Sequence, residues 1–358
     1  MEDVQKQLSV WYEENKRVLP WRTDPSPYHV WLSEVILQQT RVNQGFEYYN
    51  RFTARWPTLR DLAEASEEEV LKMWQGLGYY SRARNLHHCA REVMERYDGV
   101  FPADYEKLTR LKGIGRYTAA AIASIAYGLP HAVVDGNVYR VLSRIYDIDT
   151  PINKSGAPKL FAQLAEDLLD KNNPGRHNQA MMEFGALFCT PQNPQCLLCP
   201  IQAHCLAFAN GTINQRPQKE HKTNIRTRYL NYLLIRTDDH QVCLHKRTGN
   251  DIWRNLYDLP CIETENPIDT EALTETATFC TLTAQNDFSI DKISPPYTHK
   301  LTHQTIIATF TEIKIEGFLS LIQTKDIFLV PENDLGSYPV PKLIENYFNH
   351  NCNLQTNK

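Results

Sequence analysis

Four of the nine cysteines lie together in one short segment of the chain. Their spacing is Cys189-x6-Cys196-x2-Cys199-x5-Cys205, so that four thiols fall within 17 residues. Thiolates are strong ligands for soft metal centres, and four of them this close in sequence can converge on one small inorganic centre. The spacing therefore predicts a metal centre that is held by these four cysteines.

Two kinds of centre compete for this cysteine segment. Structural zinc bound by four thiolates usually draws them from two tight C-x2-4-C pairs that a longer loop separates. The segment has one tight pair, Cys196 and Cys199, with wider spacing on both sides, which suits a cluster with four separated corners. We therefore predict an iron–sulfur cluster, with zinc as the alternative and unrelated buried thiols as the weakest interpretation.

A glycine turn at Lys112–Arg116 (KGIGR) is a second candidate site. Glycine lets backbone N–H groups approach a phosphate closely, and the N-terminus of a following helix favours an anion. Such a turn reads the shape and charge of a nucleic acid rather than its sequence. A plain connection between two helices is the alternative. The flanking basic residues and the cysteine segment favour a helix-hairpin-helix, in which Gly113, Gly115 and Arg116 contact DNA.

The elements that position these groups are predicted to be helical up to residue 213. Apolar residues recur at helical spacing, with Gly and Pro between them, in four segments: Pro27–Thr40, Ala83–Tyr97, Tyr117–Tyr127 and Asn137–Ile145. Ser66, with Glu69 three residues later, predicts a capping box at the start of a further helix.

The pattern changes after a polar segment at 214–228, which has the composition of a solvated linker. Beyond it, residues typical of β-strands predict four strands: Tyr229–Ile235, Gln241–Lys246, Thr305–Ile315 and Ile327–Val330. The chain is therefore predicted to hold a helical domain, a linker and a smaller α+β domain.

The composition, 42% hydrophobic and 22% charged, is typical of a soluble globular protein. No run of about 18 apolar residues predicts a membrane span. The N-terminus is amphipathic and lacks the apolar stretch of a signal peptide, so we expect a cytoplasmic protein, associated with the nucleoid if it is bacterial. In that reducing compartment, clustered thiols point to metal binding rather than to disulfides.

The net charge of −4 argues weakly against a nucleic-acid partner, but the charge is unevenly distributed. Residues 1–222 carry 26 Lys and Arg against 25 Asp and Glu, whereas the rest of the chain carries 12 against 17. A near-neutral N-terminal part can bind phosphates where its basic residues gather on one face.

Together these features resemble the helix-hairpin-helix DNA glycosylase superfamily. Within it, Leu19–Arg22 (LPWR), Tyr28–Val42 (YHVWLSEVILQQTRV) and Gly76–Arg82 (GLGYYSR) are similar to the signature of the adenine DNA glycosylase (MutY) family. The resemblance covers residues 8–210 strongly and 229–345 weakly.

The resemblance implies a mostly α N-terminal helix-hairpin-helix glycosylase domain with an iron–sulfur cluster loop, followed by an α+β Nudix-like C-terminal domain. The helical domain, 1–213, would comprise a six-helix barrel part at about 25–130 and a cluster-bearing part made of 1–24 and 131–213. The linker would be 214–228, the Nudix-like lesion-recognition domain 229–345 and a tail 346–358. One 4Fe-4S cluster is implied.

The superfamily also implies two catalytic carboxyl groups. Asp135, in the segment Leu129–Val138 (LPHAVVDGNV), matches the catalytic Asp and would open a helix whose positive end keeps it ionised. Glu34 lies among apolar residues, and burial should raise its pKa, so it could protonate adenine N7. Asn137 would help to position Asp135 or the attacking water. A helix N-cap for Asp135 and a solvated helix face for Glu34 are the alternatives.

One position separates two branches of the superfamily. Endonuclease III-like enzymes carry a Lys after G-x-G-R, which forms a Schiff base and cuts the strand, whereas this chain has Tyr117. A tyrosine cannot form that imine, so a monofunctional enzyme is expected, with Tyr117 near the same sugar carbon.

The resemblance further assigns residues that hold the DNA. Trp21 and Arg22 would line the pocket for the extruded adenine, and Glu183 would contact its amino edge, although Trp21 could equally be a core aromatic. Gln39 and Tyr79 match residues that wedge into the base stack around the lesion.

In the C-terminal part, Ile252–Pro260 (IWRNLYDLP) resembles the Nudix-like module with which this family reads 8-oxoguanine. The segment Thr264–Phe279 lacks the R-E-x-x-E-E-type metal helix, so pyrophosphate hydrolysis is not expected. The family's Phe-Ser-His loop corresponds to Leu301, Thr302 and His303. We therefore expect Thr302 and His303 to recognise 8-oxoguanine, while Leu301 replaces the aromatic residue.

The sequence thus predicts a monofunctional DNA glycosylase of base excision repair. It would remove adenine opposite 8-oxoguanine, also opposite G, with A:C as a further candidate substrate. The expected partner is double-stranded DNA with such mispairs, without a membrane, and the protein is expected to be a monomer. Two other interpretations stay open: an endonuclease III-like lyase for oxidised pyrimidines, and a non-catalytic DNA-binding or redox-sensing protein.

Overall fold

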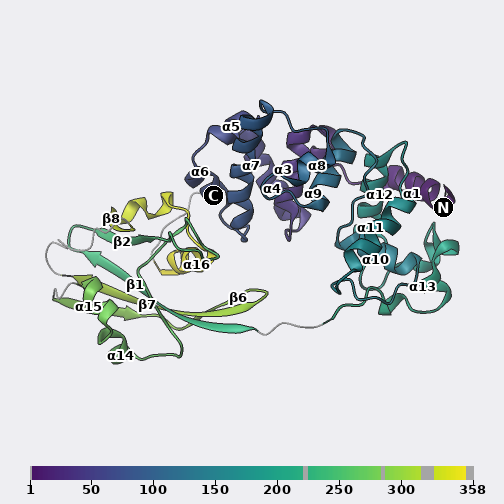
Figure 1. Cartoon of the computed structure of the whole chain (residues 1–358). Helices are drawn as coiled ribbons and strands as arrows, with labels where there is room; N and C mark the ends of the chain where they lie inside the picture. Colours follow the sequence, from purple (N-terminus) through teal and green to yellow (C-terminus); the bar gives the residue numbers. More distant parts are fainter. Residues whose placement is uncertain (1, 221–224, 284–286, 316–325, 352–358) are drawn as a thin grey trace. The chain divides into compact units, whose positions relative to one another are not determined.

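The computed structural model describes residues 2–220, 225–283, 287–315 and 326–351. These residues form two compact units (Figure 1). The first unit comprises Met1–Glu64 and Asn85–His221, and the second comprises Ala65–Arg84 and Lys222–Lys358. The predicted tail beyond 351 and residues 221–224 of the predicted linker lie outside the described ranges.

The N-terminal part of the chain is helical, as predicted. Its α-helices are α1 (Glu2–Asn15), α2 (Pro20–Thr23), α3 (Pro27–Leu37), α4 (Val42–Arg55), α5 (Leu59–Glu64), α6 (Glu67–Trp74), α7 (Ser81–Tyr97), α8 (Tyr105–Thr109), α9 (Arg116–Ala121), α10 (Gly136–Ile145), α11 (Ala157–Leu168), α12 (Pro174–Leu187) and α13 (Leu206–Ala209). A π-helical turn, η1 (Ile122–Ala126), continues α9. Three 3-10 turns follow: η2 (Cys196–Leu198), η3 (Gln202–His204) and η4 (Ile213–Gln215).

A buried apolar cluster joins α1, α10, α11 and α12. Leu8, Val141, Phe161 and Phe184 are each at most 1% exposed. Burial of one side chain of this size stabilises the fold by about 1.5–3 kcal/mol. Cys189 packs against the same cluster. The core therefore holds α10 and α12 in place beside the cysteine segment.

The second unit contains an eight-stranded sheet with the order β3-β2-β1-β7-β5, in which β4 also pairs with β1, β6 with β7 and β8 with β2. Its strands are β1 (Arg226–Thr237), β2 (Gln241–Lys246), β3 (Tyr257–Asp258), β4 (Cys261–Thr264), β5 (Phe288–Ile293), β6 (Tyr297–Lys300), β7 (Gln304–Ile315) and β8 (Ile327–Pro331). Among the strand pairs of the described residues, only β1 and β7 run parallel, with Arg226 opposite Gln304. The helices are α14 (Thr270–Thr274), α15 (Ala277–Thr283) and α16 (Lys342–Asn351), with the 3-10 turn η5 (Glu332–Ser337). The four predicted strands and the α+β class are confirmed.

Helix α6 belongs to the second unit. The capping box predicted at its start is present, because the Ser66 side chain accepts from the Glu69 amide and Glu69 bonds back to the Ser66 amide. The Lys72 ammonium donates to the Tyr338 carbonyl at 3.1 Å, and the Tyr257 hydroxyl donates to Glu68 at 2.7 Å. These bonds hold α6 against residues that are far along the chain.

No helix within the described ranges is both long enough and apolar enough to cross a membrane.

Candidate active site

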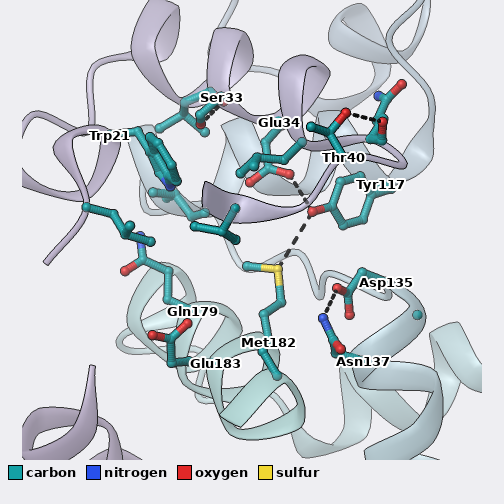
Figure 2. A pocket seen from close by; sticks show the side chains of 18 of the residues that line it. Trp21, Ser33, Glu34, Thr40, Tyr117, Asp135, Asn137, Gln179, Met182 and Glu183 are labelled. Carbon is teal, nitrogen blue, oxygen red and sulfur yellow. Dashed lines mark hydrogen bonds between the residues drawn. The ribbon is translucent and has the colours of Figure 1, made fainter. Parts of the chain in front are cut away.

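A cavity of about 420 Å³ opens in the first unit, in the size range of about 300–1,000 Å³ typical of small-molecule pockets. Figure 2 shows it from close by. Helices α2, α3, α9, α10 and α12 each contribute side chains to its lining. The cavity brings together eight of the predicted site residues: Trp21, Arg22, Glu34, Gln39, Tyr117, Asp135, Asn137 and Glu183.

Glu34 lies on the buried face of α3, a helix that begins with Ser26 as its N-cap and Pro27 as its first residue. The side chain is 8% exposed. Burial raises the pKa of Glu34 to about 7, although the hydrogen bond from Tyr117 acts in the opposite direction. The rise that the apolar context of Glu34 predicts is confirmed.

Tyr117 connects Glu34 with the far wall of the cavity. Its hydroxyl donates a hydrogen bond to Glu34 Oε2 and contacts the Met182 sulfur at 3.7 Å (Figure 2). Burial and the neighbouring carboxyl groups raise the pKa of Tyr117 well above its ordinary value. The phenol therefore stays neutral and acts as a donor to Glu34.

Asp135 is the N-cap of α10, as predicted. Its two oxygens accept hydrogen bonds from the Val138 amide at 2.7 Å and from the Asn137 side chain at 2.8 Å. Both bonds favour the ionised form, but burial has the larger effect and raises the pKa of Asp135 above its ordinary value. The amide groups at the start of α10 thus favour the ionised form, as expected, while burial acts against them.

The side chain of Asn137 is in turn fixed by hydrogen bonding to Arg140. The Arg140 guanidinium donates to Asn137 Oδ1 at 2.9 Å, to the Gly185 carbonyl at 2.6 Å and to the Cys189 carbonyl at 2.7 Å. A Cβ atom on Gly185 would lie 2.7 Å from Asn137 Cβ, so this close packing requires glycine. Continuous hydrogen bonds thus join Asp135 to the first cysteine of the cysteine segment.

Near Trp21, the charged side chains that line the cavity form ion pairs with one another. Trp21 is 7% exposed and packs edge-on against Tyr49, with ring centroids 5.1 Å apart. Arg17 and Arg22 donate to Glu183 Oε2 at 2.7 and 2.8 Å. Burial alone would raise the pKa of Glu183, but these two guanidinium groups outweigh it and lower the pKa to about 2.

Some lining residues were not predicted. Gln179 lies one helical turn before Glu183 on α12, and its Oε1 accepts a hydrogen bond from the Tyr12 hydroxyl at 2.6 Å. The spacing of Gln179 and Glu183 by four residues was the available signal that they share a helix face. Arg17 and Met182 carried no comparable local signal.

The glycine turn joins α8 to α9, as predicted. Gly113 has a φ of +79°, and a Cβ atom there would lie 2.6 Å from Asn85 Cβ. Both facts require glycine at this position. Gly115 is the N-cap of α9, and Arg116 is its first residue.

The two predicted wedge residues share a rare backbone conformation. Gln39 and Tyr79 have φ angles of 58° and 47°, which non-glycine residues seldom adopt. Gln39 lines the cavity of the first unit, whereas Tyr79 belongs to the second unit and is 50% exposed.

In the second unit, Thr302 and His303 are exposed and lie in the short connection between β6 and β7. The Tyr79 and Thr302 hydroxyl groups lie 3.2 Å apart. The structure therefore brings a predicted wedge residue and a predicted lesion reader into direct contact.

The four cysteines of the cysteine segment line one small apolar cavity. The Arg144 guanidinium donates to Cys189 Sγ at 3.3 Å and to the Thr190 carbonyl at 2.7 Å. Four sulfur ligands in an apolar site with a neighbouring positive charge suit an anionic thiolate-bound centre. The donor set therefore fits an iron–sulfur cluster.

Comparison with protein families divides the chain into three matched segments. Residues 32–167 match the HhH-GPD superfamily of base excision DNA repair proteins. Residues 189–205 match the iron-sulfur binding domain of endonuclease III, and residues 231–350 match the NUDIX domain. The predicted helix-hairpin-helix, iron–sulfur and Nudix-like parts are thereby confirmed.

Solved structures support the same fold. A thermostable thymine-DNA glycosylase superposes with a TM-score of 0.54 at 27% identity, covering 58% of this chain and 96% of that chain. A non-covalent Endonuclease III–DNA complex superposes with a TM-score of 0.50 at 23% identity, covering 58% of this chain and 94% of that chain, and shows the fold alone.

Two curated relatives carry the same name. The human (Homo sapiens) adenine DNA glycosylase is 46% identical over 231 residues, which cover 60% of this chain but only 42% of the human protein. The adenine DNA glycosylase of Buchnera aphidicola subsp. Baizongia pistaciae is 33% identical over 299 residues, covering 83% of this chain and 82% of that protein. Because this second match extends over both units, the chain belongs to the adenine DNA glycosylase family.

Proposed function

We propose that the chain is a monofunctional DNA glycosylase that removes adenine mispaired with 8-oxoguanine. Adenine opposite G is a further proposed substrate, and adenine opposite C a third candidate. The family's chemistry is hydrolysis of an N-glycosyl bond. The observation that carries the proposal is the placement of Glu34 and Asp135 on different walls of one cavity, with the Tyr117 hydroxyl bonded to Glu34.

The two carboxyl groups have the properties that the reaction requires. The target adenine must first leave the base stack and enter the cavity. Protonated Glu34 then gives its proton to adenine N7, and the bond between the sugar C1′ and adenine N9 breaks with its electron pair going to the base. The Asp135 carboxylate stabilises the cation that develops at C1′. Water adds to C1′, and its proton returns to the Glu34 carboxylate.

The wall near Trp21 would receive the base. Trp21 lines this wall, and Arg22 offers hydrogen-bond donors that Glu183 holds in place. Since the Glu183 carboxylate is engaged by Arg17 and Arg22, a direct contact with the adenine amino group would require one of these arginines to move. The side chain of Gln179, whose oxygen is engaged by Tyr12, can offer its amide NH₂ to a ring nitrogen of the base.

DNA would be held by the groups that the sequence singled out. The turn of Gly113, Gly115 and Arg116 offers backbone N–H groups to a phosphate, and Gln39 and Tyr79 would fill the space that the extruded base leaves. The proposed partner is double-stranded DNA that contains the mispair, bound by one copy of the chain.

The proposed mechanism predicts how the rate depends on pH. Glu34 must be protonated to act, so adenine release should fall by about tenfold per pH unit above its pKa of about 7. On the acid side, the rate should fall where Asp135 takes up a proton, at a pH above the ordinary range of an Asp because burial raises its pKa. Single-turnover adenine release between pH 5 and 9 would measure both limbs. A rate that stays constant up to pH 9 would exclude Glu34 as the acid.

We further propose that Cys189, Cys196, Cys199 and Cys205 hold one 4Fe-4S cluster. Such a cluster would tie the cysteine segment together, and it would stabilise the fold because ligand binding and folding are coupled. The hydrogen bonds of Arg140 connect this segment to Asn137 and Asp135, so that loss of the cluster would also disturb the catalytic carboxylate.

Removal of one cluster ligand should therefore destabilise the protein. Cys199→Ser is expected to lose the yellow-brown colour and to lower the midpoint of thermal unfolding by about 10 °C. The exposed Cys280 is the control, since Cys280→Ser should keep both colour and midpoint. Colourless wild-type protein with stoichiometric zinc would contradict the cluster.

Thr302 and His303 are proposed to read 8-oxoguanine. The hydroxyl of Thr302 is exposed and can bond the altered edge of the lesion. Thr302→Val removes that hydroxyl at nearly constant volume, and should lower the preference for A:8-oxoguanine over A:G by about tenfold, the loss expected for one hydrogen bond.

The control for this variant is Tyr79→Phe. It removes the hydrogen bond between Tyr79 and Thr302 but leaves the Thr302 hydroxyl in place. Comparison of adenine release from A:8-oxoguanine and A:G duplexes would separate the two effects. An unchanged preference in Thr302→Val would show that this loop does not read the lesion.

A further inference from the structure

The turn between α6 and α7 is held in an unusual conformation. Three of its six residues (75–80) have positive φ angles: Gly76 at 99°, Gly78 at 69° and Tyr79 at 47°. Glycine adopts this region freely, but a tyrosine does so only where its surroundings impose it. Tyr79 is nevertheless 50% exposed, so its own packing is not sufficient to impose the conformation.

Arg82 supplies the missing contacts. Its side chain is only 8% exposed, and its guanidinium donates to the carbonyl groups of Leu77 and Gly78, both at 3.2 Å. The Gly78 carbonyl also accepts from the Trp74 indole at 3.0 Å. The Arg82 backbone amide donates to the Tyr79 carbonyl at 2.9 Å. Arg82 therefore bonds the backbone carbonyl groups both before and after the Cα atom of Tyr79.

The guanidinium is also close to two aromatic rings. It is 5.0 Å from the centre of the fully buried Trp74 ring and 5.7 Å from the centre of the Tyr79 ring. Both distances allow a cation–π interaction. Burial lowers the pKa of Arg82 to about 10, so the group is still charged at neutral pH. A side chain so buried is poorly placed to bind a DNA phosphate, which distinguishes Arg82 from the exposed arginines of α7.

We propose that Arg82 is the positioning residue for Tyr79, which it holds in the conformation that presents the ring for insertion into the DNA stack. This inference rests on the proposed wedge role of Tyr79. Arg82 fixes the base of the side chain, while Thr302 contacts its hydroxyl. Pre-ordering the ring in this way reduces the conformational entropy that would otherwise be lost when DNA binds.

A double-mutant cycle in the full-length protein with its cluster tests this proposal. The variants are Arg82→Lys and Tyr79→Ala, alone and together. Both carbonyl bonds come from one nitrogen, Nη2. Lysine keeps the positive charge, but it lacks the rigid planar guanidinium that holds this nitrogen in place and packs on aromatic rings. The readouts are single-turnover adenine release from an A:8-oxoguanine duplex and the fluorescence of 2-aminopurine placed beside the target adenine, which reports base extrusion.

Arg82→Lys is expected to slow both extrusion and release by about tenfold. In the Tyr79→Ala background, the same change should add less than about twofold, because the group that Arg82 positions is already missing. Arg91→Lys, at an exposed position of α7, is the matched control and should behave like the wild type.

The inference would be overturned by a wild-type rate for Arg82→Lys, and also by effects of Arg82→Lys and Tyr79→Ala that simply multiply. A purely structural role would produce the second result together with a lower unfolding midpoint. If Tyr79→Ala itself releases adenine at the wild-type rate, the wedge role fails and the inference with it. If the wild-type chain releases no adenine, the proposed function fails, which is a distinguishable outcome.

Discussion

Replacement of Glu34 by Gln is expected to lower the single-turnover rate of adenine release from an A:8-oxoguanine duplex by about 10³-fold. Glutamine nearly preserves the shape of the side chain and can still accept the hydrogen bond from Tyr117, but it has no proton to give to adenine N7. Duplex binding should change little, because Glu34 is buried in the cavity and contacts the base only after extrusion.

The control for this variant is Glu47→Gln, which changes an exposed carboxyl group on α4. It should release adenine at the wild-type rate. Gel-shift titration of the same duplex would show whether Glu34→Gln still binds. Turnover by Glu34→Gln at the wild-type rate would contradict its assignment as the acid.

Replacement of Asp135 by Asn should cost about 10²–10³-fold in the same assay, the range for loss of one charged group that faces a developing charge. Asparagine is as good an N-cap as aspartate, so the start of α10 should remain intact. Unfolding midpoints should therefore be similar, while the stabilisation of the sugar cation is lost. This combination separates the catalytic role of Asp135 from its role as a helix cap.

Asp104 offers a matched control. It is the N-cap of α8 and accepts from the Lys107 amide at 2.9 Å, yet it is absent from the lining of the cavity. Asp104→Asn should leave adenine release unchanged. If Asp104→Asn and Asp135→Asn lose activity to the same extent, disturbed helix caps rather than a lost anion would explain the effect.

Much of the fold could be predicted because its signals are local. Apolar periodicity located α3, α7 and α10, and a serine with a glutamate three residues later located the start of α6. The raised pKa of Glu34 was also predictable, because its apolar neighbours on α3 are adjacent in sequence.

The features that could not be predicted depend on long-range contacts. Glu183 bonds Arg17, which lies 166 residues earlier in the chain, so the pairing that engages both of its oxygens has no local signal. The hydrogen bonds that hold α6 against the rest of the second unit likewise join residues far apart in sequence, such as Lys72 and Tyr338. The direction of the Asp135 pKa shift depends on the walls of the cavity rather than on the helix that Asp135 caps.

The segment proposed to read the lesion has one feature that could be predicted from the sequence and one that could not. The segment after β6 was predicted to read 8-oxoguanine because of its resemblance to a family motif, while its contact with Tyr79 became visible only in the structure. That contact joins the residue proposed to enter the stack to the residue proposed to sense the lesion.

The most direct test of the proposed function is a side-by-side measurement of base release by the full-length chain. Duplexes with adenine opposite 8-oxoguanine, G, C and T would be incubated under single-turnover conditions, with and without borohydride. We predict free adenine from A:8-oxoguanine first and from A:G more slowly, strand breakage only after alkali, and no trapped covalent adduct. Rapid borohydride trapping with spontaneous strand cleavage, or no adenine from any mispair, would contradict the proposed function.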